Sequence, residues 1–276
     1  MELLEGKKIA EKMLEDIKDK IKSENLNPGL AVILVGNNDA SKIYIDIKDE
    51  AAAKVGIDFQ KIEMSEDVSE GEVLEKISEL NKEKEINGII VQLPLPKHLD
   101  KLKIIKAIDP QKDADRFHPE NLELFLKGDD DMQPPFPRAI MELINYSGEN
   151  LESKEGIIIC NSDKFGKVMQ FILEKHGTSS EYILKEDIQS NSENIKNADI
   201  LISACGVPGL IRGDTVKQGV IIVDGGITRA DGKIIGDINP DSVKDIDGYI
   251  SPVPGGVGPV TVACLMENVY LLTKNQ

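Results

Sequence analysis

Short aliphatic runs alternate with amphipathic stretches along most of this 276-residue chain. Apolar residues recur at helical spacing in the segments 9–21, 41–55, 73–80, 168–176 and 260–273. Uninterrupted aliphatic runs are typical of buried strands and occur at 30–35, 88–94, 156–159, 199–203, 219–224 and 248–250, with a shorter run at 182–184. This alternation predicts α/β layers built around parallel sheets.

An acidic, proline-rich segment over 127–137 separates two such stretches and predicts a domain boundary. We expect residues 1–125 to form a catalytic α/β domain that the C-terminal helix 259–276 completes. Residues 126–258 are expected to form a Rossmann-type, doubly wound parallel sheet. The predicted fold class is therefore α/β, with two three-layer units and a cleft between them.

The formal net charge of −16 argues against nucleic acid as a partner, because binding to phosphates needs a basic face. No apolar run is long enough for a membrane helix, and the three histidines have no metal-ligand spacing, so we expect neither a membrane nor a metal. Cys160, Cys205 and Cys264 each lie in an apolar run. We expect them to be buried and reduced, which favours a cytoplasmic location.

The most constrained backbone of the chain is predicted just before the last helix, over residues 251–263. Prolines there fix φ and remove donors, whereas Gly255 and Gly256 permit close approach by a ligand. Pro259 suits the first position of the helix that follows. This composition predicts a rigid loop at a helix N-terminus, a common way to build a binding site.

Tyr44 and Lys48 are four residues apart in a predicted helix, so a phenol and an ammonium share one face. Ser41 lies about one turn earlier. A helical lysine is most often a solvated surface group, so this spacing alone leaves a functional role and a surface role open.

Gln92 ends an aliphatic strand and is followed by a bend at Leu93–Pro96. Open α/β sheets bind ligands at the carboxyl ends of their strands, although a glutamine can also simply cap a loop there. The segment 112–119 combines carboxylates, bases and an imidazole, and is either part of a site or a solvated charged turn.

These segments, in this order, resemble the methylenetetrahydrofolate dehydrogenase/cyclohydrolase family. The resemblance rests on motifs at 36–48, 91–96, 112–119 and 252–263 and runs over nearly the whole chain. It implies a bifunctional enzyme that oxidises 5,10-methylene-tetrahydrofolate with a nicotinamide cofactor and hydrolyses the methenyl product to 10-formyl-tetrahydrofolate. The first domain would then bind folate and the second the dinucleotide.

The resemblance also implies residue roles. Lys48 matches the catalytic lysine, Tyr44 the tyrosine that stacks on folate and Gln92 the glutamine that supports the lysine. Asp115 matches the aspartate that binds the pterin, and Ser41 the helix serine near the lysine. Further substrate contacts are implied at Leu93, Pro94, Pro254, Gly255 and Gly256. A lysine kept partly neutral by burial is suited to move the proton of the hydrolysis step.

The nucleotide-binding turn departs from the family pattern, which is roughly Gly-x-Ser-x-x-Val-Gly-x-Pro. This chain keeps Ser162 and Gly166 but has Cys160 for the first glycine and Val168 for the proline. We expect the cysteine Cβ to obstruct a pyrophosphate and Asp163 to repel it.

Glu186, next to Lys185, lies 20 residues after Gly166, where an acid binds a ribose diol and rejects a 2′-phosphate. The family implies NADP, whereas Glu186 and the altered turn favour NAD or no cofactor. The segments 203–211 and 223–229 follow the family at the nicotinamide end. The candidate cofactor-binding residues are Cys160, Asn161, Ser162, Gly166, Lys185, Glu186, Cys205, Gly206 and Ile227.

Two departures affect the folate side. Arg116 replaces a glycine and would either grip the glutamate tail of folate or partly block the pocket. Phe136 replaces a small polar residue of the interdomain segment, which changes the expected shape of the cleft.

Alternative functions remain at this point: a cyclohydrolase with a vestigial nucleotide domain, a non-catalytic folate binder or partner subunit, and an unrelated small-acid dehydrogenase. The expected partners are tetrahydrofolate derivatives and a second copy of the chain, joined as a homodimer through the nucleotide domain.

Overall fold

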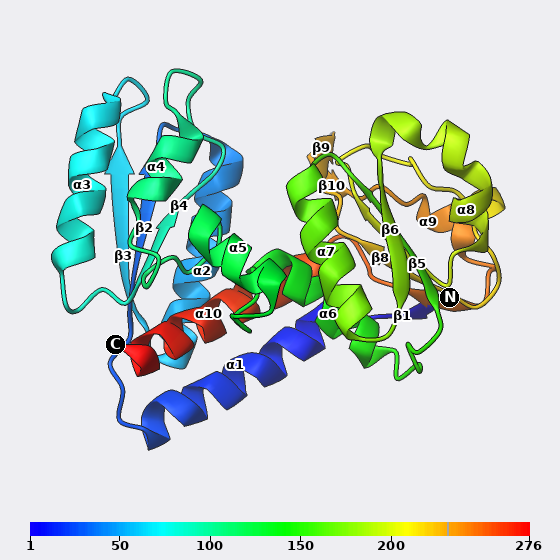
Figure 1. The fold of residues 1–276 in the computed structure, drawn as a ribbon, viewed down its shortest axis with the longest axis horizontal. Coiled ribbons are helices and arrows are strands. Elements are labelled where there is room, and N and C mark those ends of the chain that lie inside the picture. Colours follow the sequence, from blue (N-terminus) through cyan, green and yellow to red (C-terminus); the bar gives the residue numbers. More distant parts are fainter. Residues whose placement is uncertain (231) are drawn as a thin grey trace. The chain divides into compact units, whose positions relative to one another are not determined.

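The computed structural model describes residues 1–230 and 232–276, which form two compact units (Figure 1). The three-stranded unit consists of Glu11–Pro135 and Val262–Gln276, and the six-stranded unit of Met1–Ala10 and Phe136–Thr261. The chain passes between them within helix α1 (Gly6–Ser23), at the start of α6 (Pro135–Tyr146) and within α10 (Val257–Asn275). The second of these passages lies inside the proline-rich segment that the sequence marked as a boundary.

The three-stranded unit is built on a parallel sheet with the strand order β3-β2-β4. Its strands are β2 (Gly29–Val35), β3 (Asp58–Met64) and β4 (Gly88–Val91). Its helices include α2 (Asp39–Val55), α3 (Glu70–Lys82), α4 (Lys101–Ala107) and α5 (Pro119–Lys127). β2 and β4 are buried along their whole length, as their aliphatic runs predict, whereas β3 is an edge strand of alternating exposure that no aliphatic run reveals.

The central position of β2 determines where this unit can place a site. The chain leaves β2 through α2 to β3 on one side of the sheet, and then returns through α3 to β4 on the other side. Such a reversal of strand order leaves a crevice at the carboxyl ends of the two strands on either side of it, here β2 and β4. The start of α2 and the residue after β4 therefore meet at one edge of the sheet.

The six-stranded unit has the strand order β1-β11-β8-β7-β5-β6, and all neighbouring strands are parallel. Its strands are β1 (Glu2–Leu3), β5 (Glu155–Cys160), β6 (Ser179–Leu184), β7 (Ile200–Ala204), β8 (Val220–Asp224) and β11 (Gly248–Ile250). Its helices are α6, α7 (Asp163–Lys175), α8 (Ser192–Asn197) and α9 (Pro240–Val243), with an antiparallel hairpin of β9 (Thr228–Ala230) and β10 (Lys233–Ile235).

Numbered from β5, these strands follow the doubly wound order 2-1-3-4-5, with β1 added at the edge. The predicted α/β class with a Rossmann-type parallel sheet is thus confirmed. The pairing of β1 with β11 places residues 1–10 in this unit, whereas the sequence-based boundaries put them in the first domain. A strand of two residues carries too little pattern to be recognised before its partner is known.

The core of the six-stranded unit is aliphatic, as its strand sequences predict. Gly166 of α7 lies against Tyr182 of β6 so closely that a Cβ there would be 2.5 Å from the ring. Only glycine allows this helix and strand to pack at that distance. Cys160, Cys205 and Cys264 are buried, and within the described residues none of them forms a disulfide. Within the described residues, no helix is both long enough and apolar enough to span a bilayer.

Candidate active site

The amine of Lys48 on α2 donates a hydrogen bond of 2.9 Å to Oε1 of Gln92, the residue that follows β4. The amide nitrogen of Gln92 donates to the carbonyl oxygen of Leu93, also at 2.9 Å. This second bond fixes the orientation of the amide, so that its oxygen faces the lysine. Two residues 44 positions apart are therefore brought into direct contact at the edge of the sheet where β2 and β4 end.

The first turn of α2 holds the lysine in place through a helix cap. The side chain of Asn38 accepts from the backbone nitrogen of Ser41 at 3.0 Å and from its hydroxyl at 3.3 Å. Ser41 is buried, and its hydroxyl is bonded to the cap. Tyr44 is partly buried and lies one turn before Lys48 on the same helix. The structure thus places the three predicted helix residues along one stretch of α2.

The pKa values of Lys48 and Asp115 depend on burial and on the charge of the other group. Burial lowers the pKa of Lys48, and the nearby carboxylate of Asp115 partly opposes that change. Burial raises the pKa of Asp115, against the opposing effect of Lys48 and with a smaller contribution from Asp113. The lysine therefore loses its proton more readily than a solvated lysine, which suits a group that transfers protons.

Two aspartates in one short segment have opposite roles. Asp113 is 1% exposed, and its Oδ2 accepts from the backbone nitrogen of His118 at 2.8 Å and from Nδ2 of Asn121 at 2.9 Å. Asp115 is partly exposed, and its carboxylate has no hydrogen-bond partner within residues 1–230 and 232–276. Asp113 therefore ties the loop together, and Asp115 is the carboxylate left open to a ligand.

The segment 112–115 is held beside β4 and is not a solvated charged turn. The backbone nitrogen of Ile89 donates to the carbonyl oxygen of Lys112 at 2.7 Å. Lys112 is 8% exposed, and its amine donates to the carbonyl oxygens of Leu80 and Glu83 at the end of α3, at 3.2 and 2.6 Å. The lysine thus satisfies terminal carbonyls of the helix.

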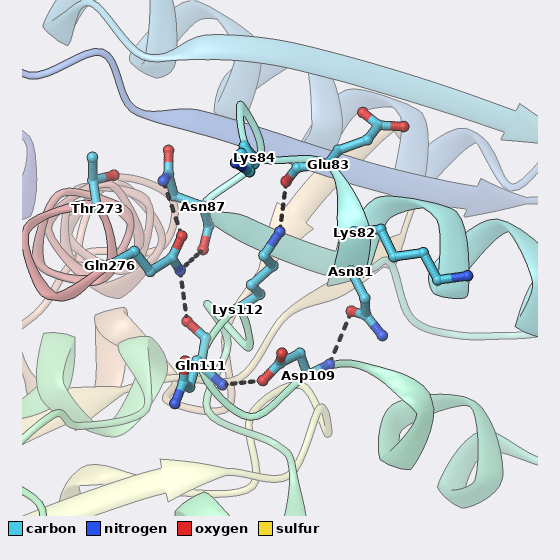
Figure 2. Close-up of a pocket in the computed structure, with 10 residues that line it drawn as sticks. All are labelled: Asn81, Lys82, Glu83, Lys84, Asn87, Asp109, Gln111, Lys112, Thr273 and Gln276. Atoms are coloured by element: carbon cyan, nitrogen blue, oxygen red, sulfur yellow. Dashed lines mark hydrogen bonds between the residues drawn. The ribbon is translucent and has the colours of Figure 1, made fainter.

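Lys112 lies at a polar cavity of about 480 Å³, and Figure 2 draws the residues that line it. It is lined by Asn81, Lys82, Glu83, Lys84, Asn87, Asp109, Gln111, Lys112, Thr273 and Gln276. The side chain of Gln276 bridges it by donating to the carbonyl oxygens of Asn87 and Gln111. None of the predicted site residues lines this cavity, so the cavity is separate from the site of Lys48 and Gln92.

Arg116 has a left-handed backbone, with φ at 58°. Glycine is favoured in this conformation, which gives a physical reason for the glycine that the family has there. The guanidinium forms an ion pair with Asp130, and the residue is 5% exposed. The cation is therefore committed to Asp130, so the structure supports neither role considered for it from the sequence.

Asn268 of α10 is a functional candidate that the sequence analysis missed. It is fully buried, and its Nδ2 donates at 3.0 Å to the carbonyl oxygens of both Ala114 and Gln133. The first of these bonds holds the backbone next to Asp115. The available signal was an asparagine whose helical neighbours at i−3 and i+4, Leu265 and Leu272, are apolar.

The proline–glycine loop before α10 is as tight as its composition predicts. The carbonyl oxygen of Gly255 accepts from the backbone nitrogen of Lys7 at 3.1 Å, and a Cβ on Gly6 would lie 2.0 Å from the carbonyl oxygen of Gly256. Helix α10 begins at Val257, so Pro259 lies within its first turn and does not open it. Pro254 to Gly256 belong to the six-stranded unit, whereas Lys48 belongs to the three-stranded unit, and their convergence stays a prediction.

The turn after β5 is closed by local contacts. Cys160 is fully buried, and its sulfur lies 3.4 Å from the carbonyl oxygen of Ser162, within the turn itself. The expected obstruction of a pyrophosphate by its Cβ stays a prediction. Ser162 precedes α7 without a side-chain capping bond, and Asn161 donates to the carbonyl oxygen of Cys205 beyond β7.

Phe136 packs within the six-stranded unit. Its ring lies 5.3 Å from that of Phe165 on α7, centroid to centroid. A Cβ on Gly225, after β8, would lie 2.8 Å from the Phe136 ring, so the glycine makes room for it. This aromatic pair accounts for the departure at Phe136 by local packing.

The remaining predicted cofactor residues follow β6, β7 and β8. Lys185 and Glu186 form a short turn directly after β6, with Glu186 exposed and its carboxylate 4.0 Å from the Lys185 amine. Gly206 has φ at 68°, and its carbonyl oxygen accepts from the Thr228 hydroxyl at 2.9 Å. Ile227 is 43% exposed.

These features fit a nicotinamide dinucleotide. The first turn of α7 leaves backbone N–H groups without helical partners at the carboxyl edge of the sheet, where a pyrophosphate is bound in doubly wound folds. Close packing of Gly166 on Tyr182 brings the start of α7 down onto that edge. The exposed Glu186 lies after the neighbouring strand, as a ribose contact requires.

A doubly wound sheet in one unit, together with a partly buried lysine–glutamine–aspartate site in the other, defines a two-domain α/β enzyme of the dinucleotide-binding class. Comparison with known proteins narrows this class. Residues 4–115 match the model of the tetrahydrofolate dehydrogenase/cyclohydrolase catalytic domain, and residues 134–276 match that of its NAD(P)-binding domain.

A curated relative, the bifunctional protein FolD of Acetivibrio thermocellus, is 41% identical over 99% of this chain and 97% of its own. The crystal structure of the bifunctional enzyme from Campylobacter jejuni superposes with a TM-score of 0.94 at 38% identity, covering 100% of this chain and 99% of the other. The enzyme from Trypanosoma brucei, solved with NADP and an inhibitor, gives 0.93 at 29% identity, covering 99% and 97%. The chain therefore belongs to the tetrahydrofolate dehydrogenase/cyclohydrolase family and is a bifunctional enzyme of folate one-carbon metabolism with an NAD(P)-binding domain.

Proposed function

We propose that Lys48 is the proton-transfer residue for hydrolysis of 5,10-methenyl-tetrahydrofolate. The observation that carries this proposal is the hydrogen bond from its amine to Gln92, in surroundings that lower the lysine pKa. A neutral amide holds the amine in position without adding a negative charge, which would raise that pKa.

Hydrolysis adds water to the cationic methenyl carbon, breaks its bond to N5 and leaves the formyl group on N10. One proton of the water is returned to N5 and the other is released. The neutral amine of Lys48 removes a proton from the attacking water, and the ammonium formed returns it as the C–N5 bond breaks. Gln92 keeps the amine directed at the reacting carbon throughout.

The open carboxylate of Asp115 is suited to bind the pterin, because it accepts hydrogen bonds from the amino and ring N–H groups in a paired geometry. Tyr44 lies one turn from Lys48 and supplies an aromatic face for stacking. We place Leu93 and Pro94, next to Gln92, and Pro254 to Gly256 among the substrate contacts.

For the oxidation step, the nicotinamide group supplies the acceptor of the hydride from the methylene carbon when it is bound. The first turn of α7, with Asn161 and Ser162 before it, is proposed to hold the pyrophosphate through backbone N–H groups. Glu186 is proposed to bind the adenosine ribose diol, which favours NAD over NADP by repulsion of a 2′-phosphate. Lys185, Cys205, Gly206 and Ile227 complete the proposed cofactor contacts, with a homodimer and a cytoplasmic location as further proposals.

The hydrolysis proposal is tested by Lys48→Met, with Lys54→Met as the control, because Lys54 is exposed at the end of the same helix. We expect Lys48→Met to reduce methenyl hydrolysis by about 10²–10⁴-fold, the usual contribution of a general acid–base group, and the control to keep wild-type activity. Hydrolysis by Lys48→Met at the wild-type rate would exclude this role.

The cofactor proposal is tested by assaying methylene-tetrahydrofolate oxidation with NAD and NADP separately. We expect the wild type to prefer NAD and Glu186→Gln to lose part of that preference, whereas Asp187→Asn, an exposed change next to it, keeps it. A preference for NADP in the wild type would contradict the ribose assignment. Hydrolysis without oxidation by either cofactor would instead indicate a cyclohydrolase with a vestigial nucleotide site.

A further inference from the structure

Asp237 is a buried carboxylate that accepts hydrogen bonds from three donors, one at the end of β7 and two in the loop that follows it. It is fully buried and follows the β9–β10 hairpin. Its Oδ2 accepts from the Ser203 hydroxyl and from the backbone nitrogen of Cys205, and its Oδ1 accepts from the backbone nitrogen of Val207, all at 2.7 Å. The end of β7 and the loop that leaves it are thus wrapped around one side chain.

Asp237 is itself held by a second buried carboxylate at the end of β8. The Oδ1 of Asp224 accepts from the backbone nitrogens of Gly226 and Asp237, both at 3.0 Å, and its Oδ2 accepts from that of Ile238 at 2.9 Å. A Cβ on Gly226 would lie 2.1 Å from the Asp237 carboxyl group. The two acids therefore connect the loops after β8 and β7 with no free space between them.

This arrangement costs free energy that ordinary packing would not require. Within residues 1–230 and 232–276 no lysine or arginine forms an ion pair with either acid, and a buried carboxylate needs hydrogen bonds to offset its desolvation. At neutral pH, a carboxylate is the only side-chain group with two oxygens that accept hydrogen bonds and no donor of its own. Asparagine at 237 would turn an N–H₂ group toward backbone N–H groups.

The loop that Asp237 holds lies at the switch point of the doubly wound sheet. β7 and β5 are neighbours, and the chain leaves them in opposite directions, so a nucleotide binds between their carboxyl ends. Asn161, after β5, already reaches the carbonyl oxygen of Cys205. With its inner N–H groups bound by Asp237, the loop presents its other side to that crevice.

We propose that Asp237 is the positioning residue of the dinucleotide site, which holds the Cys205–Val207 loop in the shape that receives the nicotinamide half of the cofactor. This inference rests on the proposed cofactor site. It assigns Asp237 no contact with the cofactor or the substrate, because its carboxylate is fully buried and bonded to three donors of the protein.

The test uses the two activities of one protein. Hydrolysis of methenyl-tetrahydrofolate needs no dinucleotide and depends on Lys48 in the other unit, so it serves as an internal control. We expect Asp237→Asn to raise the KM for the dinucleotide about tenfold or more and to leave the hydrolysis rate within about twofold. Ser203→Ala removes one of the three donors and should raise the same KM by a smaller factor. Asp245→Asn, an exposed change of equal charge in the same segment, should change neither value.

An unchanged dinucleotide KM in a folded Asp237→Asn protein would overturn the positioning role and leave the cofactor site itself intact. Equal loss of both activities in Asp237→Asn and in Ser203→Ala would also overturn it, because the acid would then serve only general folding. A wild-type protein that is not stabilised thermally by either dinucleotide would instead overturn the cofactor site on which the inference rests.

Discussion

Asp115 in the three-stranded unit and Asp237 in the six-stranded unit both lie near the strand ends that the fold provides for ligands, but they use their carboxylates differently. The carboxylate of Asp237 accepts hydrogen bonds from three donors of its own unit, whereas that of Asp115 accepts none from the described residues. The difference teaches how to tell two kinds of acid apart. An acid with several protein donors shapes a site, whereas an acid without them is available to bind a ligand there. Asp113, two residues from Asp115, belongs with Asp237 by this criterion.

The strongest way to break this comparison is to neutralise Asp115 and Asp113 separately. We expect Asp115→Asn to lower kcat/KM for methenyl hydrolysis by about a hundredfold, because charge-assisted bonds to the pterin are lost, and to leave the free energy of unfolding nearly unchanged. Asp113→Asn should instead destabilise the protein by about 1–3 kcal/mol, because Asp113 satisfies two buried donors. Steady-state kinetics and urea unfolding measure both quantities. Similar profiles for the two variants would remove the distinction.

Asn268 tests whether the open aspartate depends on a buried support. Asn268→Ala leaves two carbonyl oxygens without their donor and creates a cavity, so we expect a loss of about 2–4 kcal/mol in unfolding free energy. The KM for folate should rise as well, because the backbone beside Asp115 is released. Asn275→Ala, exposed at the end of the same helix, is the matched control. A stable Asn268→Ala protein with unchanged kinetics would argue against this support.

The buried acid pair of the six-stranded unit predicts an unusual dependence of stability on pH. Burial, with the charge of Asp237 nearby, raises the pKa of Asp224 from 3.8 to about 6. Because the folded state holds this proton more tightly than the unfolded state, Asp224 costs stability above pH 6, and the cost disappears as the pH falls toward 4. The shift corresponds to at most about 3 kcal/mol. Unfolding of the wild type and Asp224→Asn across pH 4–6 measures it, and parallel curves would contradict it.

The smallest expected effect is a change in the pKa of Lys48. Since the Asp115 charge raises the pKa of Lys48 against the lowering by burial, Asp115→Asn should lower that pKa further. The titration of Lys48 then moves to lower pH, and with it the acidic limb of the hydrolysis profile, where the neutral amine forms. NMR of ¹³C-labelled lysine follows the titration directly. A shift to higher pH would show that the two groups do not interact as the structure indicates.

The fold was largely predictable because most of its buried strands are aliphatic runs that carry their own signal. β2, β4, β5, β7 and β8 were all expected from such runs, and the parallel α/β class followed from their alternation with helices. The strands β1 and β3 were not expected, because β1 has only two residues and β3 alternates in exposure without an aliphatic run. Helix α7 begins at Asp163, earlier than the predicted start at 168, because its polar first turn resembles a loop.

The residues proposed to act on a ligand were predictable from the sequence, whereas those that form hydrogen bonds with the backbone were less so. Lys48 and Gln92 were singled out from helix spacing, a strand end and a family resemblance, and the structure brings them into contact. Asn268 and Asp237 were missed, because their partners are backbone groups whose positions only the folded chain defines. Cys160 is a similar case: the sequence records a replaced glycine but not the contact of its sulfur with the carbonyl oxygen of Ser162.

The three passages of the chain between units mean that neither unit corresponds to one continuous stretch of sequence. The six-stranded unit draws its edge strand from residues 1–10, and the three-stranded unit draws Asn268 from residues 262–276. A gene fragment cut near residue 135 would encode one piece that lacks this asparagine and another that lacks this strand. The two units are therefore expected to be inherited as one continuous gene segment, and attempts to express either half alone would have to graft a distant segment back onto it.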